Sequence, residues 1–379
     1  MRIVLLAHNL RVAGGLSVGK NIVATLPEIA PIHEYLMIVP AGCEYPDFQE
    51  QSNVSVVGIP AMGLLKRIAF DLFELPRIVR KFKPDWVWGL GNGGMLNPPC
   101  KQAILFHDAH HVYPETHYAF ESWFYKLKKR LISHQLKRAL PFVDVVFCQT
   151  ETVRKRFSDV FVYPLNQISV CPNAVSNFSD IVDGELQSPS VLGSHSKRFK
   201  LFVLTKCYGH KNLSGIIDMY SKYREELSDT VCILTIAPDQ HKIAPSILAR
   251  IEKENLGDLI LNVGPLNQEE LTCYYQSCDV LFLPTLLESF SGTYLEAMHF
   301  GRPIITSDLD FAHDVCGDAA LYCDPFDLES MKSAILKCKA SSELRAELVA
   351  KGKKRMNSFF RTWPDILRDC LDRMEIPHD

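Results

Sequence analysis

Two glutamates, Glu288 and Glu296, stand eight residues apart in a segment whose pattern could support group-transfer chemistry. The apolar run 280–283 predicts a strand, residues 284–290 a loop, and a helix is expected to begin near Ser291. Glu288 would then lie on a loop that follows a strand. Glu296, about a turn and a half into the helix, could reach a diol such as a ribose. The alternative interpretation is that Glu288 caps the helix and Glu296 is a solvated surface charge.

The start of this predicted helix is suited to binding a phosphate. Ser291, Gly292 and Thr293 are small residues, and the first backbone N–H groups of a helix have no partner within it. These groups lie at the positive end of the helix dipole, which attracts anions. We therefore expect Ser291, Gly292 and Thr293, with Phe290 just before them, to line the site of a phosphorylated donor.

Two lysines enclose a second loop. Lys206 and Lys211 flank the sequence Cys-Tyr-Gly-His, between a predicted strand and a helix expected to open at Asn212. Two ammonium groups placed there would neutralise a diphosphate leaving group as it departs. The alternative is a pair of ordinary surface lysines.

A histidine ends another predicted strand. His107 and Asp108 follow the apolar run that starts at Ala103, at the carboxyl edge where parallel sheets form their sites. His110 and His111 follow closely, so a metal site is an alternative. Adjacent residues rarely aim at one ion, and the spacing lacks the pattern of a zinc site. We expect no metal here, and a structural histidine stays open as a second interpretation of His107.

Two glycines come soon after the first predicted strand. Gly14 and Gly15 follow it through a short polar loop and precede a helical pattern. The stretch from Gly14 to Asn21 falls one residue short of a nucleotide-binding P-loop, because Asn21 has no hydroxyl to hold Mg²⁺ after Lys20. An NTPase therefore remains an alternative that lacks one of its required groups.

These candidate residues are embedded in two series of short apolar runs that alternate with helix-period stretches. Continuous apolar runs with helices between them are typical of parallel strands covered on both faces. Two such series predict two doubly wound α/β domains. The first series is 3–7, 35–39, 54–59, 86–90, 103–107 and 143–149, and the second is 199–205, 231–237, 259–263, 280–283 and 303–306.

The boundary between the two domains is predicted from a stretch that lacks apolar periodicity. The stretch is rich in Ser, Asp, Gly and Pro. We expect an N-terminal Rossmann-like domain over residues 1–178, a linker over 179–197, a second domain over 198–358 and a final segment over 359–379. Ligands are expected between the carboxyl ends of the two sheets.

Length and composition agree with this organisation. A chain of 379 residues exceeds one ordinary domain, and 47% hydrophobic with 22% charged residues is typical of globular proteins. No apolar run approaches the roughly 20 residues that span a bilayer. The twelve cysteines form no Cys-x-x-Cys pair and are expected to be buried, reduced thiols. We expect the protein to stay in the cytoplasm.

Charge is distributed unevenly between the two halves. Residues 1–178 carry 19 Lys and Arg against 14 Asp and Glu, a balance of +5, and the remainder has 22 against 30, a balance of −8. Residues 123–140 combine an apolar stripe with basic flanks at helical spacing, as helices at membrane interfaces do. This segment is either a solvated helix or a peripheral contact with an anionic membrane on its inner face. Nucleic-acid binding is not expected, because aromatic residues do not interleave with the basic run.

The glutamate segment resembles the signature of glycosyltransferase family 4. That signature has a Glu-Gly-Phe-Gly-type loop, a helix with Glu-Ala-Met, and then Gly-x-Pro-Val/Ile, and residues 288–305 are similar to it. Ser289 and Ser291 stand where the family most commonly has Gly. Residues 168–173 are similar to the closing strand of the family's first domain, and the segment after Phe359 resembles its C-terminal helix.

The lysine pair also resembles a family motif, Arg-x4-Lys. Lysine at position 206 replaces the usual arginine, which gives up bidentate phosphate geometry. The resemblance implies a GT-B fold, in which two Rossmann-like domains face each other across a cleft and the C-terminal helix returns to the first domain. It implies a nucleotide-sugar donor in the second domain, no metal or other cofactor, and retention of anomeric configuration. It places His107 near the donor sugar, and Gly14 and Gly15 beside the diphosphate and acceptor.

The predicted reaction transfers a hexosyl residue from GDP-mannose or a UDP-hexose to a glycan or lipid-linked acceptor hydroxyl, as in cell-surface polysaccharide synthesis. Glu288 and His107 are the predicted catalytic residues. Retention without an evident nucleophile indicates front-face displacement. An epimerase or hydrolase on the same fold and a non-catalytic sugar-binding protein are the alternatives.

Overall fold

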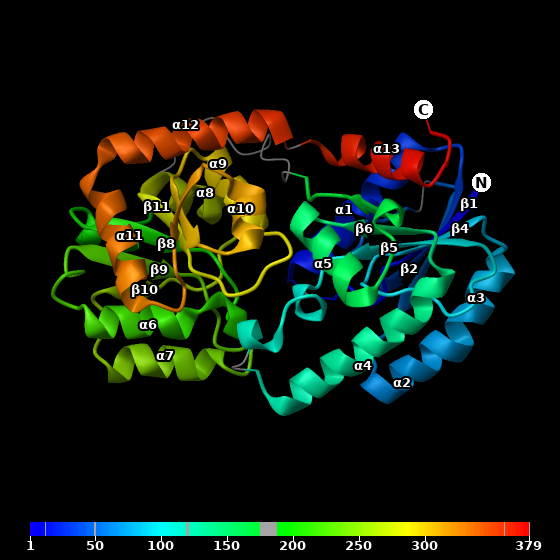
Figure 1. The fold of residues 1–379 in the computed structure, drawn as a ribbon, viewed down its shortest axis with the longest axis horizontal. Coiled ribbons are helices and arrows are strands. Elements are labelled where there is room, and N and C mark those ends of the chain that lie inside the picture. The colour runs from blue at the N-terminus through cyan, green and yellow to red at the C-terminus, as the bar shows by residue number, and fades with distance from the viewer. Residues whose placement is uncertain (12, 49–50, 119–120, 175–187, 360, 379) are drawn as a thin grey trace. The chain divides into compact units, whose positions relative to one another are not determined.

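The chain forms two compact units in the computed structural model (Figure 1). The described residues are 1–11, 13–48, 51–118, 121–174, 188–359 and 361–378. The first unit comprises residues 1–113, 122–174 and 361–379, and the second comprises 114–121 and 175–360. Of the predicted linker 179–197, residues 179–187 lie outside the described part, and Ser190–His195 form a short 3₁₀ helix.

The first unit is built on a seven-stranded sheet in the order β3-β2-β1-β4-β5-β6-β7, with every pairing parallel. Its strands are β1 (Arg2–Leu6), β2 (Glu34–Pro40), β3 (Val54–Ile59), β4 (Trp86–Gly89), β5 (Lys101–Phe106), β6 (Val145–Cys148) and β7 (Ile168–Val170). Its helices are α1 (Ala13–Ile29), α2 (Leu64–Ala69), α3 (Leu75–Phe82), α4 (Trp123–Ala139), α5 (Glu151–Phe161) and α13 (Trp363–Arg373), and a π-helical turn, η1 (Phe70–Glu74), joins α2 to α3.

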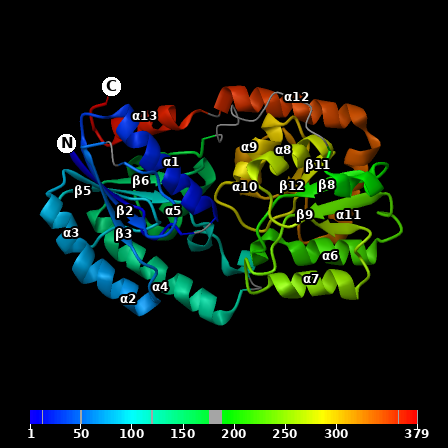
Figure 2. The ribbon, with the colours of Figure 1, turned by 180° about the vertical axis from the view of Figure 1, so that it is seen from behind.

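Both faces of this sheet are buried, which explains the continuous apolar runs. In β1, Ile3 and Leu5 belong to the core that includes α1 and α13, whereas Val4 and Leu6 belong to the core that includes η1 and α3. Successive strand residues point to opposite faces, so each face needs its own apolar set. The layers are visible from both sides of the molecule (Figures 1 and 2).

The C-terminal helix completes the first unit. Helix α12 (Ser342–Phe359) belongs to the second unit, whereas α13 packs against α1. Thr362 caps α13 and Asp365 returns the reciprocal hydrogen bond, so the helix start is well defined. Leu367 and Ile366 are buried in the same core as α1. The predicted return of the C-terminal helix to the first domain is confirmed.

The second unit contains a six-stranded parallel sheet in the order β10-β9-β8-β11-β12-β13. Its strands are β8 (Phe199–Val203), β9 (Thr230–Leu234), β10 (Ile260–Asn262), β11 (Val280–Leu283), β12 (Ile304–Ser307) and β13 (Ala320–Cys323). Its remaining helices are α6 (Leu213–Lys222), α7 (Ala244–Lys253), α8 (Gln268–Ser277), α9 (Gly292–His299), α10 (Asp310–Cys316) and α11 (Leu328–Ala340).

The predicted fold class, two doubly wound α/β domains, is confirmed. Every predicted strand is present, and β13 is an additional strand that the sequence pattern did not indicate. Half of β13 is only partly buried, so its pattern is less apolar than that of the central strands. Among the described residues, no helix combines the length and apolar character required to cross a bilayer.

Candidate functional site

The predicted donor residues of the second unit gather where the strand order reverses. Strands β8 and β11 are neighbours, and their connections lead outward to β9 and β12 on opposite sides. In open parallel sheets, ligands bind outside the carboxyl ends of strands at such a switch point. The loop after β8 carries Lys206 and Lys211, and the loop after β11 carries Glu288.

Glu288 and Lys211 form an ion pair across these two loops. Their side chains retain only 12% and 17% of their exposure, so water screens the pair poorly. The Thr285 hydroxyl lies 3.4 Å from the same carboxylate oxygen and 2.9 Å from the His210 carbonyl oxygen, and the Leu286 N–H donates to that carbonyl at 2.7 Å. The two loops are therefore tied together with their opposite charges in contact.

The start of α9 is open, as expected for an anion site. Ser291 caps the helix without a side-chain hydrogen bond and is buried, whereas Gly292 is exposed. A Cβ atom added at Gly292 would meet nothing within 4 Å. Among the described residues, no hydrogen-bond acceptor is assigned to the backbone N–H groups of Gly292 and Thr293. This geometry leaves room for a phosphate at the positive end of the helix.

Glu296 lies one and a half turns into α9, partly buried, and accepts a hydrogen bond of 3.0 Å from the Tyr275 hydroxyl. Burial raises the pKa of Glu296, and the hydrogen bond from Tyr275 opposes that shift. Phe290 packs against the hydrophobic core of this unit. Lys206 is exposed and has no acidic partner among the described residues, in contrast to Lys211.

The first unit brings two of its predicted residues together. His107 directly follows β5, and its backbone N–H donates to the Asn92 side chain at 2.6 Å. A Cβ atom added at Gly15 would lie 3.4 Å from Nε2 of His107. Gly14 and Gly15 lie in the first turn of α1, which begins at Ala13. The prediction that these glycines precede the helix is therefore wrong, because the helix starts earlier than its apolar face indicates.

The histidine beside this turn is uncharged near neutral pH. Burial lowers the pKa of His107 to about 4, with Asp108 opposing and Lys129 reinforcing the shift. Burial would raise the pKa of Asp108, but the Lys129 ammonium and the His110 hydrogen bond hold it well below its usual range. His111 bonds Ser133 at 2.6 Å. Asp108, His110 and His111 thus form a structural network with Lys129 and Ser133.

This network does not form a metal site. In the part of the chain that the structure describes, no three His, Cys, Asp or Glu side chains are grouped to hold an ion. The P-loop alternative also loses its basis, since Gly14 to Lys20 are helical and form no loop to cradle a phosphate.

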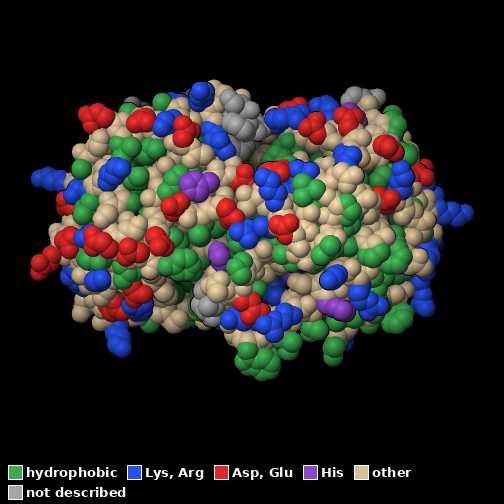
Figure 3. Space-filling view, viewed as in Figure 1, with side chains coloured by type: hydrophobic (Ala, Val, Ile, Leu, Met, Phe, Trp, Pro, Cys, Tyr) green, Lys and Arg blue, Asp and Glu red, His purple; other side chains and the backbone are tan. Residues whose placement is uncertain are grey.

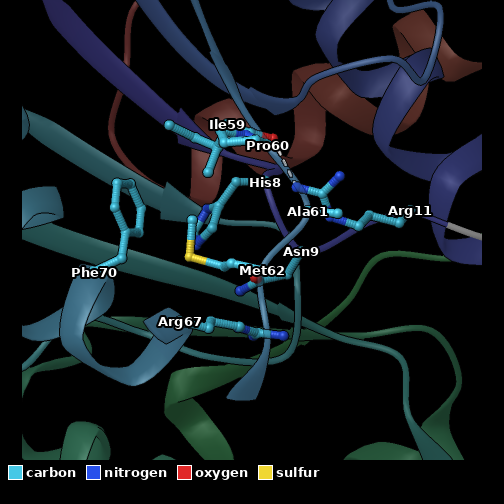
Figure 4. A pocket seen from close by; sticks show the side chains of 9 residues that line it. All are labelled: His8, Asn9, Arg11, Ile59, Pro60, Ala61, Met62, Arg67 and Phe70. Carbon is cyan, nitrogen blue, oxygen red and sulfur yellow. Dashed lines mark hydrogen bonds between the residues drawn. The ribbon is translucent and has the colours of Figure 1, made fainter. Parts of the chain in front are cut away.

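Sequence reasoning missed a third cluster in the first unit. His8, Asn9 and Arg11 line a cavity with residues 59–62 and with Arg67 and Phe70 (Figure 4). The available signal was the position of His8 just beyond the end of β1, at the switch point between β1 and β4.

Solved structures share this fold along nearly the whole chain. The Anabaena protein HepE, in complex with UDP and glucose, superposes with a TM-score of 0.74 at 14% identity and covers 99% of both chains. WaaG, a glycosyltransferase involved in lipopolysaccharide biosynthesis, superposes with a TM-score of 0.72 at 14% identity and covers 98% of this chain and 99% of its own. The fold class is therefore GT-B.

Sequence comparison identifies the family. Residues 31–177 match the family model "Glycosyltransferase Family 4", and residues 187–355 match "Glycosyl transferases group 1". The chain belongs to glycosyltransferase family 4. The O-antigen chain mannosyltransferase RfbU of Salmonella typhimurium is 24% identical over 62% of this chain and 60% of its own length. The Escherichia coli O-antigen chain mannosyltransferase B is 28% identical over 33% of this chain and 32% of its own length.

Proposed function

We propose that this protein transfers a hexosyl residue from GDP-mannose or a UDP-hexose to a hydroxyl of a glycan or lipid-linked acceptor, with retention and without a metal. The observation that carries the proposal is the Glu288–Lys211 pair at the β8/β11 switch point. The mannosyltransferase relatives favour GDP-mannose, and the UDP and glucose bound to HepE favour a UDP-hexose. Polysaccharide synthesis agrees with the O-antigen relatives.

In the proposed reaction the bond between the anomeric carbon and the leaving phosphate oxygen breaks, and the acceptor oxygen bonds to the same face of that carbon. The acceptor proton passes to the leaving phosphate oxygen. Lys206, Lys211 and the N–H groups of Gly292 and Thr293 stabilise the charge that accumulates on the diphosphate. Glu288 supports the positive charge that develops on the sugar ring.

Two further residues hold the donor in this proposal. Glu296 binds the ribose hydroxyls as an acceptor. His107 contacts a sugar hydroxyl as a neutral imidazole, consistent with its lowered pKa. Gly15 leaves the space beside that ring open, because any side chain there would come within contact distance of Nε2.

Thermal-shift screening against UDP-, GDP- and ADP-sugars identifies the donor, and product analysis then tests the reaction. Transfer should require an added acceptor, whereas sugar release without acceptor would indicate a hydrolase and donor isomerisation an epimerase. Donor binding with no product under either condition would favour a non-catalytic sugar-binding role.

We further propose that α4 contacts an anionic membrane surface on its cytoplasmic face. Trp123, Phe124 and Leu131 are 63%, 66% and 53% exposed on a helix that also exposes Lys128 and Arg130. Hydrophobic and basic side chains gather along α4 in the space-filling view (Figure 3). Such a combination binds the headgroup region of anionic bilayers.

Vesicle flotation tests this contact. The protein should float with vesicles that contain phosphatidylglycerol and not with pure phosphatidylcholine. The double variant Trp123→Ser, Phe124→Ser should lose flotation, whereas Val162→Ser, a control at a residue that is 84% exposed on the same unit, should keep it. Equal flotation of both variants, or none with anionic lipid, would contradict the proposal.

A further inference from the structure

A cavity of about 120 Å³ opens at the carboxyl edge of the first sheet, outside β1 and β3. The connection after β1 supplies His8, Asn9 and Arg11 to its wall. The end of β3, the connection after it and the turn α2–η1 supply the rest. In the view of Figure 4, His8 and Met62 lie between Phe70 on one side and Arg11 on the other. The cavity therefore combines an apolar wall with cationic side chains.

Positive charge exceeds negative charge around this cavity. The Arg11 guanidinium donates to the Ile59 carbonyl oxygen at 2.7 Å and has no acidic partner among the described residues. Arg67 Nε lies 3.5 Å from Oδ2 of Asp71, but that carboxylate is shared with His8 and does not line the cavity. Both guanidinium groups thus retain N–H donors, and such groups bind phosphate and carboxylate in paired hydrogen bonds.

His8 adds a buried polar atom. Its side chain is only 6% exposed, and its Nε2 lies 3.0 Å from Oδ1 of Asp71. Its Nδ1 is buried with no hydrogen-bond partner among the described residues. His8 lines the cavity and buried polar atoms normally have partners, so this unpartnered ring nitrogen agrees with a polar ligand at the site.

The same connection links the cavity to the predicted catalytic histidine. Leu10 stands between Asn9 and Arg11 in the sequence, and its side chain lies 3.4 Å from a Cβ atom added at Gly15. That added atom would also lie 3.4 Å from Nε2 of His107. The segment that lines the cavity therefore also passes close to His107 within the first unit.

We propose that this cavity binds a negatively charged group of the acceptor, a phosphate or a carboxylate, through Arg11 and Arg67. That the anion belongs to the acceptor rests on the proposed function, whereas anion binding at these arginines involves the first unit alone. A neutral sugar would leave the Arg11 charge uncompensated in the complex. The acceptor is thus a phosphorylated sugar or a uronic acid rather than an uncharged glycan end.

The experiment measures ligand-induced shifts of the thermal unfolding midpoint in solutions matched for ionic strength with NaCl. The probes are inorganic phosphate, glucose 6-phosphate, glucuronate and, as the neutral control, glucose. Arg11→Gln leaves the Asp71 contacts intact, and the double variant Arg11→Gln, Arg67→Gln removes both guanidinium groups. Arg77→Gln changes an exposed arginine of α3 outside the cavity and is the matched control.

A second variant pair separates this cavity from the donor site. Lys206→Gln, Lys211→Gln should lose its response to nucleoside diphosphates and keep its response to glucose 6-phosphate or glucuronate. Arg11→Gln should keep its response to nucleoside diphosphates and bind the anionic sugar more weakly. The apparent Kd of that sugar should rise about tenfold, equivalent to about 1.4 kcal/mol. The anionic probe that binds more tightly shows whether the cavity prefers a phosphate or a carboxylate.

The proposal is overturned if no anionic probe shifts the wild type beyond glucose, or if Arg11→Gln and Arg77→Gln respond alike. It is also overturned if the anion response disappears with the two lysines and survives loss of the two arginines. A missing response to nucleotides alone would instead contradict the proposed donor function and leave the cavity assignment standing.

Discussion

Replacing Glu288 by glutamine is expected to separate donor binding from sugar transfer. In the structure the Glu288 carboxylate is paired with Lys211, and both side chains are largely buried. Glutamine preserves the size of the side chain and an oxygen for the Thr285 hydroxyl, which lies 3.4 Å away. It removes the negative charge, so the Lys211 ammonium becomes fully available to a diphosphate.

The structure sets the size of both effects. Ion pairs with some exposure contribute up to about 1 kcal/mol, and the 12% and 17% exposure of this pair justifies the upper end. Since 1.4 kcal/mol corresponds to a factor of ten, a nucleoside diphosphate should bind Glu288→Gln roughly fivefold more tightly. Loss of a group that stabilises transition-state charge should lower kcat by about 10²–10³.

Isothermal titration with UDP, GDP and ADP, alongside a transfer assay, measures the two quantities. Lys211→Gln should weaken nucleotide binding, and Glu269→Gln, at an exposed glutamate of α8, should behave as wild type in both assays. If Glu288→Gln loses nucleotide binding as Lys211→Gln does, Glu288 holds the loops in place and has no separate catalytic role. Near-normal transfer by Glu288→Gln would refute its catalytic assignment.

Three further predictions follow from burial and charge. Because burial raises the pKa of Glu296, donor affinity should fall as the pH decreases toward that raised value, and titrations of Glu296→Gln should lack this dependence. His107 has a folded-state pKa of about 4, below the ordinary histidine value of about 6.5. The free energy of unfolding, measured with urea, should therefore fall as the pH drops from about 6.5 to about 4. This decrease should be smaller in His107→Asn. Leu367→Ala, at a fully buried position of α13, should lower the free energy of unfolding by about 3 kcal/mol, whereas Arg368→Ala on the same helix should change it little; equal effects would contradict the packing of α13 in the core.

Most of the fold could be predicted because burial on both faces leaves a continuous apolar signal. The central strands β1 and β11 are apolar except for Arg2 at the start of β1, and both were predicted close to their observed bounds. The edge strand β13 was missed because half of its residues are only partly buried. The start of α1 was placed too late, since its first turn carries Gly14 and Gly15, which contribute no apolar periodicity.

The two candidate sites differ in how much the sequence alone could indicate. Glu288 and the α9 start share one continuous segment, so their proximity follows from local structure. The cavity around Arg11 draws on segments near residues 8, 60 and 67, which only the parallel order β3-β2-β1 and the turn into η1 bring together. Such a site has no local sequence pattern. Its net charge can be determined only when the ion-pair partners of each arginine are known.

The two lysines of the proposed donor site, Lys206 and Lys211, differ in a way that their shared motif does not indicate. Lys206 is exposed and unpaired within the described residues, so it can meet a phosphate without breaking a contact. Lys211 is already committed to Glu288, and any phosphate that approaches it must share its ammonium with that carboxylate. A lysine forms such contacts as a point charge, whereas an arginine would fix the carboxylate in a bidentate pair. In the proposed mechanism, a phosphate that takes over the Lys211 ammonium would leave Glu288 less constrained, and this is the state in which the carboxylate must face the sugar.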